Sequence, residues 1–270
     1  MSTISNKATD YFIALGKEDE FGVVYSEDGK RLKGCNRKDI ESYEIKEGTE
    51  IIGVMSFSDC ETLKHLTIPN TVKTIERYAF SGCTSLQQLT IPSSIKIIDV
   101  NPFCDSGCRV LTINSPHFVF ENEMLINKRN NNLIAYLGDK KTPVIPNWVN
   151  IIGDEAFINC DCIQQIAIPN SVVSLGYMAF GSCRSLLQIL IPDSVTEIGY
   201  EAFCGCVLLE QIVIPESVTS IKLDTFKYCT FLRKIIVPYG SIPKFKQMLD
   251  KSVWNIIQYA PDYEEIYNNN

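Results

Sequence analysis

The sequence is poor in histidine and has no long apolar run, and each shortage excludes a class of protein. Its two histidines, His65 and His117, belong to no zinc-binding or catalytic motif, and no glycine-rich phosphate-binding loop is present. No stretch approaches the roughly eighteen consecutive apolar residues of a membrane-spanning helix. We therefore expect a protein that is not an enzyme, needs no cofactor and does not insert into a membrane.

Basic residues are also too few for a general nucleic-acid binder. The chain has 25 Lys and Arg against 32 Asp and Glu, which gives a net charge of −7. Because binding to nucleic acid rests on clustered Lys and Arg, nucleic acid is not expected as a partner. The first residues are polar and lack the apolar centre of a secretory signal. This predicts a cytoplasmic protein, and the alternative is a secreted or cell-surface protein whose signal has been removed.

What the sequence does contain is a repeat of constant length. Ile-Pro or Val-Pro pairs place proline at positions 69, 92, 146, 169, 192, 215 and 238, so the spacing is the same throughout except for one longer gap between 92 and 146. A phenylalanine and a cysteine follow the same period, as Phe57, Phe80, Phe157, Phe180, Phe203 and Phe226 and as Cys60, Cys83, Cys160, Cys183, Cys206 and Cys229. Self-similarity at a fixed period is the signature of a solenoid.

Residues 186–206 illustrate how one repeat is expected to fold. They contain an L-x-x-L-x-L pattern in which Ile189 and Ile191 point inward from a strand and Leu190 points outward. Pro192 ends the strand because it has no N–H to donate to a ladder. One such coil cannot bury its apolar side alone, whereas stacked coils form one continuous core.

The predicted fold class is therefore α/β, a right-handed, curved leucine-rich-repeat solenoid with parallel strands on its concave face and short helical turns behind. Nine strands are expected, near residues 43–45, 66–68, 89–91, 111–113, 143–145, 166–168, 189–191, 212–214 and 235–237. Two segments interrupt the repeat, 24–32 and 125–133, and each places Asp-Gly or Asn-Asn between apolar runs. That pattern is typical of a β-hairpin, so we infer two modules, each a hairpin followed by coils.

The repeat and its interruptions define the expected organisation of the chain. Its parts are an N-terminal cap with a β-hairpin (1–37), a first repeat block (38–113), a β-hairpin insertion (114–140), a second repeat block (141–238) and a C-terminal helical cap with an acidic tail (239–270). Ser241 is expected to cap a short helix near 242–250, which would cover the last coil.

These repeats resemble the BspA-like leucine-rich repeat family. The resemblance lies in I-P-N-S-V-V-S-L-G-Y-M-A-F-G-S-C at 168–183, in I-P-D-S-V-T-E-I-G-Y-E-A-F-C-G-C at 191–206 and in their sister units, and it covers roughly residues 38–250. The hairpin insertion and V-P-Y-G-S-I-P-K-F-K at 237–246 also look like elements of that family. The resemblance implies a surface protein that takes part in adhesion or in binding host proteins.

Eleven cysteines raise the question of a metal site or of disulfides. Cys160 and Cys162, and likewise Cys204 and Cys206, form C-x-C pairs, but zinc sites favour longer spacers and two such pairs brought together. Because the cysteines follow the repeat, we predict buried free thiols that pack as small hydrophobes in a reducing compartment. A zinc site is the alternative, and no metal is expected.

The outward strand positions carry the functional hypothesis. One outward column is Ser42, His65, Gln88, Val110, Thr142, Gln165, Gln188, Gln211 and Lys234, and the next is Glu44, Thr67, Thr90, Thr112, Val144, Ala167, Leu190, Val213 and Ile236. The second column is polar in its first four strands and apolar in its last five. An exposed apolar strip rimmed by polar groups commonly marks a partner site, whereas isolated β-branched residues reflect only strand preference.

We therefore predict a protein-binding patch on the concave sheet of a monomeric solenoid. Its apolar centre is Leu190, Val213 and Ile236, and hydrogen bonds at its rim come from Gln165, Gln188, Gln211, Arg233 and Lys234. The hairpin at 120–137, with three asparagines at its tip, is a second candidate that is equally well explained as decoration. A cell-surface adhesin and a self-assembling structural repeat are the alternative functions.

Overall fold

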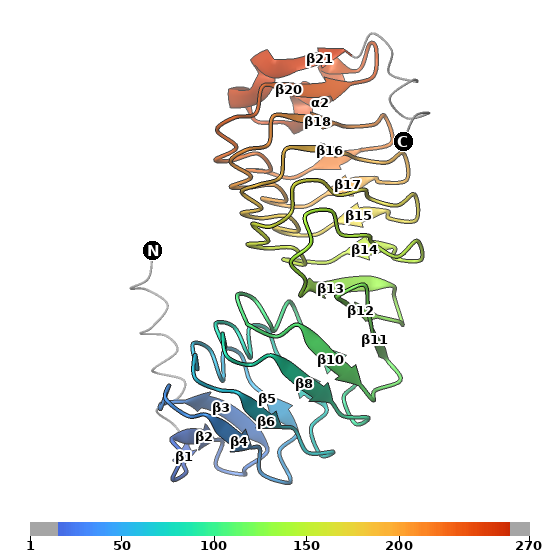
Figure 1. Cartoon of the computed structure of the whole chain (residues 1–270). Helices are drawn as coiled ribbons and strands as arrows, with labels where there is room; N and C mark the ends of the chain where they lie inside the picture. The colour runs from blue at the N-terminus through green and yellow to red at the C-terminus, as the bar shows by residue number, and fades with distance from the viewer. Residues whose placement is uncertain (1–15, 260–270) are drawn as a thin grey trace. The chain divides into compact units, whose positions relative to one another are not determined.

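The computed structural model describes residues 16–259, and the chain divides into two compact units, Met1–Leu125 and Ile126–Asn270 (Figure 1). The expected acidic tail lies outside the described residues. In both units the chain runs in stacked coils, and equivalent strands of successive coils pair in parallel, one repeat apart. Most coils contribute a longer strand to one sheet and a two-residue strand to another. We call these the long-strand sheet and the short-strand sheet.

The first unit begins with an antiparallel hairpin. The strands of its short-strand sheet, in spatial order, are β1 (Lys17–Glu18), β2 (Val23–Tyr25), β3 (Arg31–Cys35), β5 (Ile51–Ile52), β7 (Thr74–Ile75) and β9 (Ile97–Ile98). Its long strands are β4 (Ser42–Glu44), β6 (His65–Thr67), β8 (Gln88–Ile91) and β10 (Val110–Ile113), and β11 (Phe118–Glu121) follows them. The hairpin predicted at 24–32 is confirmed, since β2 and β3 pair antiparallel and β3 then pairs parallel with β5.

The second unit repeats this arrangement. Its short-strand sheet has the order β12 (Met124–Asn127), β13 (Asn132–Tyr136), β14 (Ile151–Ile152), β15 (Ser174–Leu175), β17 (Glu197–Ile198) and β19 (Ser220–Ile221). Its long-strand sheet is β16 (Gln188–Leu190), β18 (Gln211–Val213), β20 (Lys234–Val237) and β21 (Ile257–Tyr259). The strands predicted near 143–145 and 166–168 are reduced to isolated bridges, Val144 to Ala167 and Gln165 to Gln188.

Stacked phenylalanines fill the core behind the strands. In the second unit the ring centroids lie 5.1 Å apart for Phe157 and Phe180, 5.4 Å for Phe180 and Phe203, and 5.9 Å for Phe203 and Phe226. In the first unit Phe103 extends the stack from Phe80 at 5.3 Å. Burial of each ring contributes roughly 1.5–3 kcal/mol before entropy is counted, so these stacks hold successive coils in register.

The short helical turns expected behind the strands are not present in residues 16–238. The segments between each two-residue strand and the repeat cysteine, such as 176–183, are runs of tight turns, which we call the turn layer. Two residues of each run, four apart, have positive φ, for example Met178 (46°) and Ser182 (56°). A left-handed residue breaks an α-helix, and here the N–H groups of Met178 and Ser182 bond to the next coil instead, at 2.9 Å and 2.7 Å.

The C-terminal part covers the last coil with a helix and a further strand. Helix α2 spans Ile242–Met248, is followed by the 3-10 helix η1 (Lys251–Ile256), and leads to β21, which extends the long-strand sheet. The helix predicted near 242–250 is thus confirmed, but its capping by Ser241 is not. The Ser241 hydroxyl instead donates to the carbonyl of Pro238 at 2.6 Å. Within residues 16–259 no helix combines the length and apolarity needed to cross a bilayer.

Candidate protein-binding face

The register of the long-strand sheet places the predicted patch residues of the second unit in two adjacent rows. Gln188 lies beside Gln211 and Gln211 beside Lys234, while Leu190 lies beside Val213 and Val213 beside Ile236. The bridge from Gln165 to Gln188 adds a further coil to the first row. Since parallel strands lie about 4.8 Å apart, each row presents one side chain per coil.

The glutamine row is held by a side-chain hydrogen bond. Gln211 Nε2 donates to Gln188 Oε1 at 2.9 Å. Gln165 and Gln188 are exposed and Gln211 is half-buried. Each amide has two donor hydrogens and an acceptor oxygen, so one bond along the row leaves further hydrogen-bonding capacity on every side chain.

The apolar row is less exposed than the alternation predicts. Val213 is only 6% exposed, and Leu190 and Ile236 are half-buried. Two residues earlier in the row are open to solvent, since Val144 is 69% exposed and Ala167 is also exposed. The accessible apolar surface of this row therefore lies toward its first two coils, and Val213 is buried between Leu190 and Ile236.

Charge gathers at the other end of the rows. Arg233 and Lys234 are consecutive at the start of β20, and both are exposed. The N–H groups of both residues donate to the carbonyl of Glu210 in the preceding coil, at 2.9 Å and 3.3 Å. The backbone is therefore fixed where the two cations begin, while the cationic groups extend to the surface.

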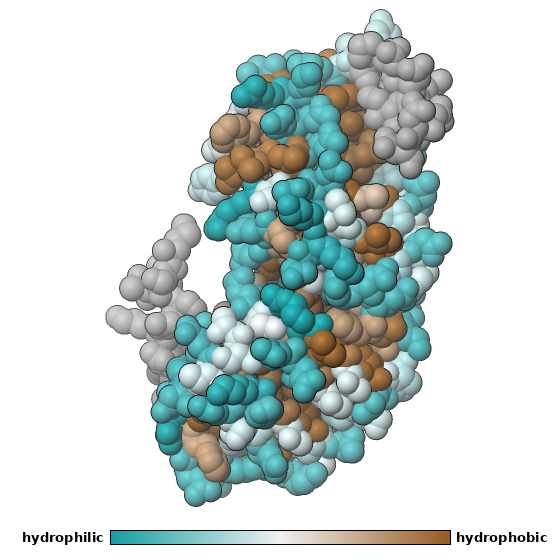
Figure 2. Space-filling model, viewed as in Figure 1, coloured by the Kyte–Doolittle hydropathy of each residue, from teal (hydrophilic) through white to brown (hydrophobic). Residues whose placement is uncertain are grey.

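The long-strand sheet of the first unit has a different chemistry. Glu44, Thr67 and Thr90 are exposed at positions equivalent to the apolar row, and so is Thr112 on β10. His65 is exposed on β6, as predicted. The polar row of the first unit is therefore exposed along its length, whereas the apolar row of the second unit is exposed mainly at Val144 and Ala167. Figure 2 shows that apolar patches on the visible face are separated by hydrophilic side chains.

The hairpin predicted at 120–137 is formed by β12 and β13, which are neighbours in the sheet. At its tip, Asn131 Nδ2 donates to Asn150 Oδ1 at 2.7 Å, and the Asn130 carboxamide accepts from the N–H of Asn132 at 3.3 Å. Asn150 Nδ2 in turn donates to the carbonyl of Ser171 at 3.0 Å. These contacts tie the tip to the first coils of the second unit and give the asparagines a structural role.

The repeat cysteines lie inside the coils. Cys60, Cys83, Cys183 and Cys206 are fully buried, and Cys160 and Cys229 are half-buried. Burial is the main cause that raises the pKa of the Cys83 thiol to about 12 and that holds the pKa of the Cys206 thiol well above its usual range. In residues 16–259 no cluster of three or more His, Cys, Asp or Glu side chains is arranged to hold a metal ion.

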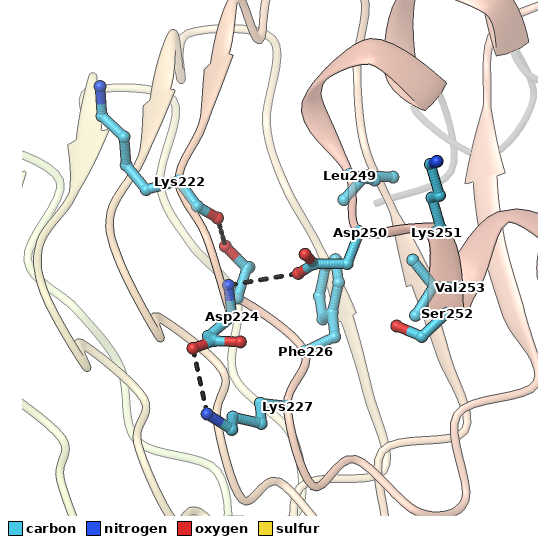
Figure 3. Close-up of a pocket in the computed structure, with 10 residues that line it drawn as sticks. Lys222, Asp224, Phe226, Lys227, Leu249, Asp250, Lys251, Ser252 and Val253 are labelled. Atoms are coloured by element: carbon cyan, nitrogen blue, oxygen red, sulfur yellow. Dashed lines mark hydrogen bonds and ion pairs between the residues drawn. The ribbon is translucent and has the colours of Figure 1, made fainter.

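A pocket of about 320 Å³ lies where the last coil meets the C-terminal cap (Figure 3). Its polar wall is internally paired, because Lys227 forms an ion pair with Asp224 at 3.1 Å and the N–H of Asp224 donates to Asp250 at 3.2 Å. Lys222 is paired with Glu197 at 3.5 Å. No sequence pattern indicated this pocket, since it depends on how the cap packs against residues 222–227.

The repeat matches a known family model and known structures. The model is described as BspA type leucine rich repeat region, and it matches residues 33–138 and 127–256 with 6 copies. A leucine rich cell surface protein from Faecalibacterium prausnitzii is similar at a TM-score of 0.62 and 30% identity, over 82% of this chain and 63% of that one. The chain therefore spans less than two thirds of the length of that protein.

Two further structures share the fold at lower identity. The pneumococcal vaccine antigen PcpA has a TM-score of 0.61 at 21% identity, over 82% of this chain and 68% of its own. A leucine-rich repeat protein from Eubacterium ventriosum has a TM-score of 0.60 at 19% identity, over 78% of this chain and 72% of its own. No curated protein is detectably similar in sequence.

Proposed function

Because the chain belongs to the BspA-type leucine-rich repeat family, we propose that it is a non-catalytic protein that binds a protein partner through the long-strand sheet of its second unit. The supporting observation is the register that aligns Gln188, Gln211 and Lys234 in one row and Leu190, Val213 and Ile236 in the next. A sheet built this way is preformed, so little conformational entropy is lost when a partner docks. In a right-handed, curved solenoid this sheet would be the concave face.

Each part of the patch has its own role in this proposal. Leu190 and Ile236 supply the apolar contact at the centre, with the buried Val213 between them in the row, and the exposed Val144 and Ala167 extend that contact. Gln165, Gln188 and Gln211 offer hydrogen bonds along one side, and Arg233 and Lys234 offer charged donors at the end. A specific interface needs roughly 800 Å² on each partner, an area that requires several adjacent coils rather than one.

Binding at a cell surface is the second candidate, as an adhesin for host proteins. It is favoured by the likeness to the cell-surface protein from Faecalibacterium prausnitzii, which reaches 30% identity. The two candidates share the same binding face and differ in location. Detection of the chain on intact, non-permeabilised cells favours the surface candidate, and detection only after lysis favours the cytoplasmic one.

The experiment is affinity capture with two matched variants. The patch variant carries Ala167→Glu and Lys234→Glu, both at exposed positions of the long-strand rows. The control carries Val173→Glu, which also adds a carboxylate at an exposed apolar residue but lies next to the short-strand sheet. We expect wild type and control to retain the same bound protein and the patch variant to lose it by at least about tenfold. Equal capture by all three proteins, with all three folded by circular dichroism, rules out this face.

A further inference from the structure

Four repeat cysteines each have the same type of hydrogen-bonding partner. The thiols of Cys83, Cys183, Cys206 and Cys229 each donate to the carbonyl of the phenylalanine 26 residues earlier, with Sγ–O distances between 3.0 Å and 3.1 Å. The cysteine therefore links each coil to the one before it. This contact requires a preceding coil that carries a phenylalanine in its turn layer.

Cys60 belongs to the first coil and has no such phenylalanine before it. The residue at the equivalent earlier position is Gly34 on β3 of the N-terminal hairpin. The thiol of Cys60 instead interacts with the thiol of Cys35, the next residue on β3, because Lys38 donates to the carbonyl of Ser58 and Thr62 donates to the carbonyl of Lys38, which packs the end of β3 against the first coil. Both side chains are at most 1% exposed, so the two sulfur atoms face each other out of contact with water.

The surroundings fix the position of both thiols. Cys35 Sγ donates to the carbonyl of Arg37 at 2.9 Å, which fixes this thiol at the end of β3. Lys38 Nζ donates to the carbonyl of Ser58 at 2.6 Å and places an ammonium group close to the thiol pair. Thr62 Oγ1 donates to the carbonyl of Lys38 at 3.1 Å. The segment after β3 is thus attached to the first coil on both sides of the pair.

We propose that Cys35 and Cys60 form a disulfide-bonding pair, which joins the N-terminal hairpin covalently to the first coil under oxidising conditions. The structure records both as free thiols, which is the reduced state of the pair. The other repeat cysteines differ from this pair, because the thiols of Cys83, Cys183, Cys206 and Cys229 each donate to a carbonyl of the preceding coil, whereas the Cys60 thiol meets the Cys35 thiol there.

The bond would form by exchange with a low-molecular-weight disulfide. Cys35 acts first, because the hydrogen bond from Cys60 and the nearby Lys38 ammonium lower the pKa of its thiol and favour its thiolate. The thiolate attacks one sulfur of the small disulfide, forms a mixed disulfide and releases one small thiolate. Cys60 then loses its proton to that thiolate and attacks Cys35 Sγ, which releases the second small thiol. The two protein thiols lose two electrons, and the small disulfide gains them.

The experiment exposes the full chain to oxidised and reduced glutathione at several ratios, both folded and during refolding from urea. Free thiols are then blocked by alkylation under denaturing conditions, and peptides are mapped by mass spectrometry. We expect one cross-linked peptide pair, joining Cys35 to Cys60, and an unfolding temperature of the first unit about 5–10 °C higher after oxidation. A Cys35–Cys60 disulfide that forms only during refolding also supports the proposal. In that case the two thiols react before the hairpin packs and buries them.

Three variants make the result specific. We expect Cys35→Ser and Cys35→Ala to remove both the cross-link and the temperature shift. We expect Cys183→Ser, which replaces a thiol that donates to a carbonyl, to preserve both. Cys35 lies in the hairpin rather than in the repeated coils, so its replacement does not interrupt the thiol-to-carbonyl series. Full alkylation of Cys35 and Cys60 at every glutathione ratio, in both folded and refolded protein, overturns the proposal. So does a dominant bridge between any other two cysteines.

Discussion

The Cys206 thiol donates a hydrogen bond to the backbone carbonyl of Phe180, with 3.1 Å between Sγ and the oxygen. Both residues are fully buried, and the same carbonyl also accepts from the N–H of Cys183 at 3.3 Å. A thiol is small, tolerates apolar surroundings and still supplies a weak donor. Alanine would be small enough but has no donor, which explains in physical terms why cysteine occupies this repeat position.

We predict that Cys206→Ala lowers the free energy of unfolding by about 1–3 kcal/mol, because it leaves a cavity and removes one of the two donors to a buried carbonyl. Cys206→Ser keeps a donor near the same carbonyl and is expected to cost less. Urea denaturation followed by circular dichroism measures both changes. Equal losses for the two variants would show that the packing of the sulfur, rather than its hydrogen bond, holds this position.

Because several thiols are buried, we also predict that the free energy of unfolding falls at alkaline pH. Burial raises the pKa of the Cys108 thiol to about 11 and that of the Cys83 thiol to about 12, from an ordinary value of 9.0. Above pH 9 the unfolded chain releases these protons and the folded chain keeps them. The free energy of unfolding is therefore highest below pH 9 and falls as the pH rises toward 12, by about 1 kcal/mol per pH unit for each buried thiol.

The test for this pH dependence is a comparison of wild type with Cys83→Ser between pH 8 and pH 11. The variant lacks one titrating thiol, so the difference in its free energy of unfolding from wild type should shrink as the pH rises. Tyr25 is buried and also has a raised pKa, but it is present in both proteins and cancels in the difference. A difference that stays constant across this range contradicts the assignment of the effect to Cys83.

The sequence was sufficient to predict the coils but not the layer behind them. The strand positions could be predicted from the repeat period and the alternation of apolar residues. The constant proline spacing also predicted correctly which residues of neighbouring strands lie beside each other in the rows. The prediction of short helical turns was wrong, because the left-handed residues of the turn layer include Met178 and Glu201. Methionine and glutamate rarely adopt positive φ. Their conformation is imposed by bonds to the next coil, which no local propensity encodes.

The predicted patch shows a similar limit. Alternation correctly placed Val213 on the side of the strand opposite Ile212, yet Val213 is 6% exposed because burial depends on neighbouring side chains as well as on direction. Phe103 was missed for a different reason. It lies one repeat after Phe80 and continues the ring stack, so the period itself was a sufficient signal.

Two glycines of the same coil predict opposite tolerance to substitution. A Cβ on Gly199 would lie 2.5 Å from the carbonyl carbon of Gly176 in the preceding coil, so Gly199→Ala must push two coils apart. We expect a loss of about 1–3 kcal/mol in the free energy of unfolding. Gly205 has a φ of 75°, but Asn159 and Ser182 adopt similar values at equivalent positions. Gly205→Asn is therefore expected to cost less than about 1 kcal/mol.

These two glycine variants are compared by urea denaturation at neutral pH. Because both replace a glycine of the same coil, differences in the unfolded chain are similar and the contrast reports on the folded state. A larger loss for Gly205→Asn than for Gly199→Ala would contradict close backbone approach as the reason for glycine at 199.

The N-terminal hairpin is attached to the first coil by a buried phenol. The Tyr43 hydroxyl donates to Asp19 Oδ2 at 2.6 Å and lies 2.7 Å from the Tyr25 hydroxyl. We predict that Tyr43→Phe lowers the free energy of unfolding by about 1–3 kcal/mol, because the rings still pack but two buried polar groups lose a partner. Tyr239→Phe is the matched control, since Tyr239 is 88% exposed, and it should leave stability within about 0.5 kcal/mol of wild type.

The same variant changes the response to acid. Burial raises the pKa of Asp19, but hydrogen bonds from Tyr43, from the N–H of Val23 and from Lys46 outweigh it and hold the pKa below its ordinary value of 3.8. The stability that Asp19 contributes is therefore present above pH 4 and is lost as the pH falls through its lowered pKa. Without the Tyr43 hydroxyl the pKa of Asp19 rises, so acid unfolding of Tyr43→Phe should begin at a higher pH than in wild type. Coincident acid transitions, after correction for the loss at neutral pH, would show that the phenol does not stabilise the Asp19 carboxylate.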